Sequence, residues 1–173
     1  MRAVVVYESM FGSTRTLAEE VGAGLRECGV VAEVVEVGEQ AAREGALPEA
    51  DLLVVGAPTH AFGLSRSSTR EDARKELPTP LVSPGIGVRE WLEQLGPVNG
   101  TPFATFDTKV RTPDLPGSAA KGAHKRLRHA GGTALAPART FRVNGKADGL
   151  VDGERAAAHA WGAELGRALT AAR

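Results

Sequence analysis

The sequence predicts a doubly wound α/β fold, in which a five-stranded parallel sheet carries helices on both of its faces. Three observations predict it. The length of 173 residues is that of one domain, since a domain takes about 150 residues. Short, continuous apolar runs indicate strands that are buried on both faces. Amphipathic segments fall between most of these runs, which is typical of βαβ units. We therefore expect residues 1–173 to form a single domain.

The first three strands and one helix follow from the spacing of apolar residues. Residues 3–7 read Ala-Val-Val-Val-Tyr, a β-branched run that suits a buried strand. From Thr14 onward, leucine or valine recurs every four residues until Gly29, which predicts an amphipathic helix with a glycine stop. Residues 30–37 are expected to form the second strand and residues 51–56 the third.

The second half of the chain repeats this alternation after an irregular segment. Residues 64–87 contain three prolines in their last ten positions, and we expect an irregular excursion with one short helix there. The fourth strand is predicted over 102–106, and the fifth over 133–143 with an interruption at Pro137. Helices are expected at three further places, residues 88–95, 118–130 and 153–172.

The composition narrows the class of function. The formal net charge is zero, with 42% hydrophobic and 24% charged residues, which argues against a disordered chain and a basic nucleic-acid binder. No apolar run is long enough to span a bilayer, and no signal-peptide pattern follows Met1, so we expect a soluble cytoplasmic protein. A single cysteine, Cys28, fits a reducing compartment, and the four histidines show no metal-ligand spacing.

The charges are distributed unevenly along the chain. Residues 1–60 hold ten acidic and four basic side chains, whereas residues 109–146 hold nine Lys or Arg and one acid, Asp114. Such a basic segment is usually a solvated surface. It can also steer an anionic partner, and we expect an acidic partner surface or an anionic substrate.

Two loops at the carboxyl ends of predicted strands carry the candidate binding residues, because ligands of open parallel sheets bind at that edge. The loop after the first strand contains hydroxyls and a glycine just before a helix, where free N–H groups can hold a phosphate. Its residues are Ser9, Met10, Phe11, Gly12, Ser13 and Thr14. The alternative is that Ser13 or Thr14 simply caps the helix.

The loop after the third strand adds flat side chains at the same edge. An imidazole and an aromatic ring there could enclose a flat ligand. The residues are Pro58, Thr59, His60, Ala61, Phe62 and Gly63. The alternative is that Phe62 closes the edge of the core and that His60 is an ordinary surface histidine.

Together the two loops resemble those of the flavodoxin family. Its phosphate loop reads approximately [Ser/Thr]-x-x-Gly-[Asn/Gln/Ser]-Thr, and its third strand often runs into Gly-x-Pro-Thr. The matching residues are Ser9, Gly12, Ser13, Thr14, Gly56, Pro58 and Thr59. Similarity of motifs is strong only within residues 1–63. Residues 107–111 read Asp-Thr-Lys-Val-Arg, without the several acidic residues and the tyrosine typical of many flavodoxins, and Ser13 replaces a longer side chain.

The resemblance implies a sheet order of 2-1-3-4-5 and FMN as the cofactor. Residues 9–14 would hold the FMN phosphate, and residues 59–63 would lie against the isoalloxazine. A loop that starts at Asp107 and includes Thr108 and Lys109 would cover the other face of the ring. No catalytic or metal-binding residue is assigned.

The resemblance also implies an electron-transfer protein that serves redox partner proteins. Two alternatives remain: a reductase on the same fold that uses NAD(P)H or a quinone, and an interaction module that has kept the fold without the flavin. Other nucleotide folds fare worse. The chain lacks a Gly-x-x-x-x-Gly-Lys-[Ser/Thr] loop, and its third strand ends in Val54-Val55-Gly56 where a receiver domain needs an aspartate.

Overall fold

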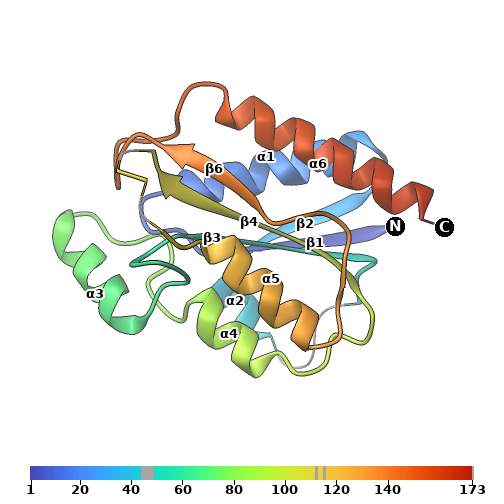
Figure 1. The fold of residues 1–173 in the computed structure, drawn as a ribbon, viewed down its shortest axis with the longest axis horizontal. Helices are drawn as coiled ribbons and strands as arrows, with labels where there is room; N and C mark the ends of the chain where they lie inside the picture. The colour runs from blue at the N-terminus through green and yellow to red at the C-terminus, as the bar shows by residue number, and fades with distance from the viewer. Residues whose placement is uncertain (44–48, 112, 115, 173) are drawn as a thin grey trace.

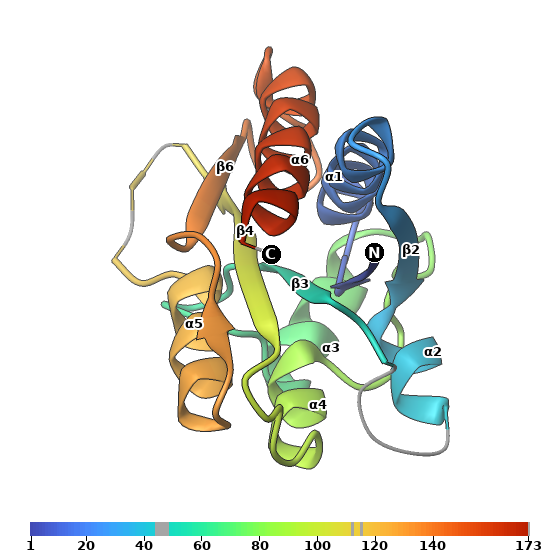
Figure 2. The same cartoon turned by 90° about the vertical axis from the view of Figure 1, so that its right-hand side faces the viewer.

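In the computed structural model, a parallel sheet has helices packed against both faces (Figures 1 and 2). The structure describes residues 1–43, 49–111, 113–114 and 116–172. The strands are β1 (Arg2–Tyr7), β2 (Val31–Glu36), β3 (Leu52–Pro58), β4 (Pro102–Val110), β5 (Thr133–Ala134) and β6 (Arg139–Val143). The helices are α1 (Ser13–Glu27), α2 (Val37–Ala42), α3 (Ser67–Glu76), α4 (Val88–Gln94), α5 (Ala119–His129) and α6 (Glu154–Ala171).

The predicted strand order is confirmed, with one addition. The sheet runs β2-β1-β3-β4-β5, and β6 also pairs with β4. The expected fifth strand is thus divided: Thr133 pairs with Pro102 at one end of β4, and Arg139 pairs with Phe106 further along it. Pro137 lies between the two pieces, and proline has no N–H to donate to a sheet. The six-residue helix α2 was not predicted.

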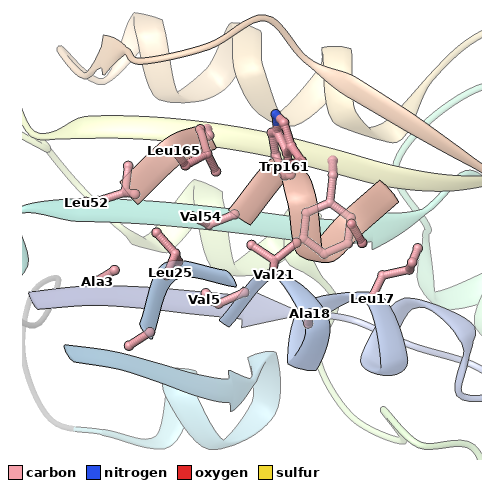
Figure 3. Close-up of a cluster of buried hydrophobic side chains, with 14 of the residues drawn as sticks. Ala3, Val5, Leu17, Ala18, Val21, Leu25, Leu52, Val54, Trp161 and Leu165 are labelled. Carbon is pink, nitrogen blue, oxygen red and sulfur yellow. The ribbon is translucent and has the colours of Figure 1, made fainter. Parts of the chain in front are cut away.

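The strand residues alternate between two cores, one on each face of the sheet. In β1, Ala3 and Val5 face the core under α1 and α6, while Val4 and Val6 face the core under α4 and α5. All four are fully buried, as a strand covered on both faces requires. Figure 3 shows part of the first core. Within the described residues, no helix is long and apolar enough to cross a membrane.

Helices α1 and α6 pack closely because glycines line their contact. A Cβ atom on Gly24 would overlap the carbonyl oxygen of His159, and one on Gly162 would overlap the carbonyl oxygen of Val21. The two backbones therefore approach more closely than any side chain would allow. Beneath them, Trp161 lies 6.0 Å from the ring of Phe106 in an edge-to-face arrangement. This contact holds α6 against β4 of the sheet.

We expect Gly24→Ala to destabilise the protein by about 1–3 kcal/mol, because overpacking forces the two helix backbones apart. Gly122→Ala in α5 is the matched control. A Cβ there meets Leu64 at 3.6 Å, an ordinary contact, so the gain in helix propensity should stabilise by about 0.5–1 kcal/mol. Urea unfolding measures both variants. Equal effects of the two substitutions would contradict the close-packing argument.

Candidate functional site

A pocket of about 310 Å³ lies at the carboxyl ends of the central strands, the edge beyond which α3 is placed (Figure 1). Ten of the residues singled out in the sequence line it: Ser9, Met10, Phe11, Ser13, Thr14, Pro58, Thr59, His60, Ala61 and Thr108. Five others do not line it: Gly12, Phe62, Gly63, Asp107 and Lys109. The two loops that the sequence analysis paired are therefore brought together.

The amino-terminal end of α1 opens into this pocket without a capping side chain. Gly12 occupies the N-cap position with φ 105°, and a Cβ atom on it would meet nothing within 4 Å. Ser13 and Thr14 lie inside the helix, so neither is the cap that the alternative interpretation required. The hydroxyls of Thr14 and Thr108 share a hydrogen bond of 2.9 Å. The N–H groups of the first helical turn have no partner further back in the helix, which suits them to an anion.

The excursion between β3 and α4 braces the loop before α1. The N–H of Ser9 donates to the Ser83 hydroxyl at 3.0 Å, and the N–H of Ser83 donates to the Ser9 carbonyl at 2.8 Å. The N–H of Val82 donates to the Met10 carbonyl at 3.0 Å. The sequence predicted an irregular excursion here, but its hydrogen bonds to the loop before α1 were not predicted.

A buried carboxylate, Glu8, connects this loop to the excursion and to α4. Its side chain is fully buried at the end of β1. One oxygen accepts a hydrogen bond from the Ser65 hydroxyl, and the other accepts one from the N–H of Val88 at 2.8 Å. Burial raises the pKa of the Glu8 carboxyl, against the opposing effect of these hydrogen bonds and of Arg70.

The guanidinium group of Arg70 extends this network. It donates to the Ser65 hydroxyl at 2.8 Å and pairs with Glu90 at 3.1 Å. A side chain at Gly87 would collide with Arg70 and would come within 3.0 Å of Glu8. Position 87 therefore admits only glycine while the network stays as it is.

The turn after β3 has an unusual backbone. His60 and Gly63 exchange two hydrogen bonds of 2.8 and 2.9 Å, and the residues between them, Ala61 and Phe62, have φ angles of 37° and 78°. A left-handed conformation costs a non-glycine residue about 1–2 kcal/mol. Phe62 is 63% exposed, so it does not close the edge of the core as the alternative interpretation proposed.

His60 lines the pocket from the same turn. Burial lowers the pKa of the His60 imidazole, and the nearby positive charges of Lys146 and Arg70 lower it further. The ring is therefore neutral at neutral pH. A neutral imidazole can both donate and accept a hydrogen bond.

The prediction of a loop that starts at Asp107 is wrong, because β4 continues through Val110. The alternation of a strand then sends neighbouring residues to opposite faces. Thr108 lines the pocket, whereas fully buried Asp107 accepts hydrogen bonds from the Thr59 hydroxyl at 2.9 Å and the N–H of Ala120 at 3.0 Å. Lys109 forms an ion pair of 2.9 Å with Asp114, and it does not line the pocket.

The remaining walls of the pocket come from α3, β4, β6 and the segment after β6. These lining residues were not anticipated: Thr69, Asp72, Ala73, Glu76, Val110, Val143 and Lys146. Lys146 pairs with Glu76 across 70 positions of sequence. One signal was present in the sequence, since the four residues from α3 are spaced three or four apart and thus share one helix face.

A family model described as flavodoxin matches residues 5–161. The chain belongs to the flavodoxin family. No curated protein matches it in sequence. Because the match spans both the loop before α1 and the divided fifth strand, it covers almost all of the elements that form the pocket.

Solved structures agree with this flavodoxin fold at low sequence identity. A flavodoxin from the domain Archaea matches with a TM-score of 0.64 and 19% identity over 98% of this chain and 99% of that one. Oxidised flavodoxin 1 from Bacillus cereus gives a TM-score of 0.68 and 16% identity over 96% and 98%. The flavodiiron protein from Giardia intestinalis gives 0.66 and 16% over 98% of this chain but 36% of that chain.

The pocket of this flavodoxin-family protein is compatible with a phosphate-bearing flat ligand. Open space beside Gly12 and an uncapped helix end suit the phosphate, while the Pro58–Ala61 backbone forms a wall on which a ring can lie. Among the described residues, no group of three or more His, Cys, Asp or Glu side chains could hold a metal ion.

We expect Glu8→Gln to remove a pH dependence of stability. Because burial raises the pKa of Glu8, the folded protein keeps a proton that the unfolded chain releases above its ordinary pKa. The wild-type free energy of unfolding should therefore fall relative to the variant as pH rises from about 4.5. Urea titrations from pH 4 to 8 measure the difference. Parallel pH profiles for the two proteins would show that Glu8 does not titrate in this way.

Proposed function

We propose that this protein binds FMN non-covalently in the pocket and carries electrons between redox partners. One observation supports this above all: the uncapped end of α1 opens into a pocket that continues to the turn after β3. In doubly wound folds, this is the edge at which nucleotide cofactors bind. We also assign the activity to the cytoplasm, the reducing compartment that a chain with one cysteine fits.

Different residues would bind the phosphate and the ring of FMN. The hydroxyls of Ser9, Ser13 and Thr14, with the backbone N–H groups around them, would hold the phosphate without any lysine. Thr59, His60 and Ala61 would lie along the ring. When bound, FMN supplies the redox chemistry, and the protein tunes it through hydrogen bonds and nearby charge.

The charges that line the pocket differ from those expected from the sequence. Lys109 forms an ion pair with Asp114 and does not line the pocket. The charged groups that line it are the carboxylates of Asp72 and Glu76 and the ammonium group of Lys146. Lys146 pairs with Glu76, and Asp72 forms only a long ion pair of 3.9 Å with Lys75 in which both side chains are exposed, so the charge of Asp72 is partly compensated on that wall. A negative wall disfavours the addition of electrons to a bound ligand.

Asp72→Asn should raise the midpoint potential of bound FMN, because it removes a negative charge from the pocket wall. The shift should be on the order of tens of millivolts, the size expected for one charge near a protein surface. Glu27→Gln, at the far end of α1, is the control and should leave the potential unchanged. Redox titration of both holoproteins measures the effect. A potential that does not move in Asp72→Asn would remove Asp72 from the cofactor's surroundings.

Thr14→Ala should weaken FMN binding at least tenfold, because a hydrogen bond to a charged phosphate contributes about 1.5–3 kcal/mol. Thr14→Ser keeps the hydroxyl and should bind almost as tightly as the wild type. Riboflavin, which lacks the phosphate, should bind far more weakly than FMN. Titrations of the apoprotein by flavin fluorescence give all three affinities. Equal affinity for FMN and riboflavin would refute the assignment of the phosphate loop.

Two outcomes would favour the other functions. Rapid oxidation of NADH or NADPH by the FMN-loaded protein alone would indicate a reductase. The absence of a flavin absorbance near 450 nm after incubation with FMN would indicate an interaction module. We expect binding of FMN and slow NAD(P)H turnover.

A further inference from the structure

Three arginines gather where α4 and α5 meet the segment before α3. The guanidinium group of Arg89 donates to the carbonyls of Leu64 at 2.7 Å and Ser65 at 3.0 Å, which immediately precede Arg66. Arg126 joins them from α5, where its guanidinium group reaches the Gly122 carbonyl at 3.3 Å. We call Arg66, Arg89 and Arg126 the arginine cluster. Arg89 belongs to α4 and Arg126 to α5, the helices that cover one face of the sheet (Figure 2).

The positive charges of this cluster are not neutralised by carboxylates in ion pairs. Elsewhere around the site, cations are paired: Arg70 with Glu90, Lys109 and Arg142 with Asp114, and Lys146 with Glu76. In the part of the chain that the structure describes, none of the three clustered arginines forms such an ion pair. Burial lowers the pKa of Arg89, and the charges of Arg126 and Arg66 lower it further, against the opposing charges of Glu90 and Glu93. The arginines thus repel one another and favour an anion beside them.

An exposed aromatic ring lies in the segment that leads to Arg66. Phe62 precedes Arg66 by four residues and is 63% exposed at the tip of the turn. The carbonyl of Phe62 packs against Gly117, where any side chain would collide with it. The backbone of the turn is therefore in close contact with the segment before α5. The residues just before it, His60 and Ala61, line the pocket. A partner that covers Phe62 would therefore lie beside the pocket.

We propose that Phe62 and the arginine cluster form the docking face for an acidic protein partner. The proposal rests on the proposed function, which requires a partner at the rim of the pocket. Guanidinium groups bind carboxylates in a bidentate manner, and an exposed aromatic ring supplies the apolar anchor that protein interfaces favour. Nucleic acid fits less well, because the cluster is compact and the whole chain carries no net positive charge.

The probe is a fluorescein-labelled peptide of twelve residues in which glutamates flank two leucines. Its binding to the apoprotein is measured by fluorescence anisotropy at low salt. Arg66→Gln combined with Arg126→Gln should weaken binding at least tenfold, and Phe62→Ala should weaken it about threefold or more. Arg155→Gln combined with Arg167→Gln, on α6, makes the same change in net charge and should alter binding less than twofold.

Two further measurements make the result decisive. Amide chemical shifts of labelled protein should move most at residues 62–66, 89 and 126 when the peptide is added. Unchanged affinity in the cluster variant, shifts that centre on another face, or tighter binding of a single-stranded oligonucleotide of equal charge would each overturn the proposal.

The outcome for docking is separate from the outcome for the cofactor. The peptide is tested on the apoprotein, and the altered arginines do not line the pocket. Peptide binding without FMN binding would refute the electron-carrier function and leave the docking face in place. FMN binding without peptide binding would refute the docking face and leave the proposed cofactor site in place.

Discussion

The site depends on one carboxylate that has no access to water. Glu8 directly follows β1 inside the protein, and its oxygens fix the Ser65 hydroxyl and the amino-terminal end of α4 at Val88. An uncompensated buried carboxylate costs several kcal/mol, so these partners must stay in place. The loop that begins at Ser9 is thereby tied to the excursion that forms the opposite wall. Fully buried Asp107 does the same for the turn after β3, through Thr59 and the start of α5.

The order of strands followed from the sequence because each strand is a short apolar run with turn residues around it. The sequence indicated the division of the fifth strand through Pro137, but it did not indicate that β4 ends only at Val110. Asp107 and Lys109 are polar and looked like loop residues, yet the strand continues because Asp107 has buried hydrogen-bond donors. Those donors come from α5 and from the turn after β3, which no local pattern can reveal. Helix α2 was missed for the opposite reason, since six residues carry too little periodicity.

The two loops of the pocket were predictable because their residues follow strands that a parallel sheet must bring to one edge. The wall from α3 was not, although Thr69, Asp72 and Glu76 share one helix face. Sequence places such a face on a helix but does not say what the helix covers. Here Met10, Ala73 and Leu81 form a small apolar cluster that seats α3 near the loop before α1. Only the folded chain shows that a charged helix contributes to the site.

The close contact of α1 with α6 has a consequence for synthesis of the protein on the ribosome. The apolar face of α1 is made early, whereas its cover, α6, is completed 144 residues after Glu27, at Ala171. At translation rates of about 5–20 residues per second, this face waits roughly 7–30 seconds for its partner. During that interval the surface of α1 around Val21 and Gly24, which α6 covers in the folded protein, has no permanent cover. The native contact of α1 with α6 therefore cannot form until synthesis of the chain is nearly complete.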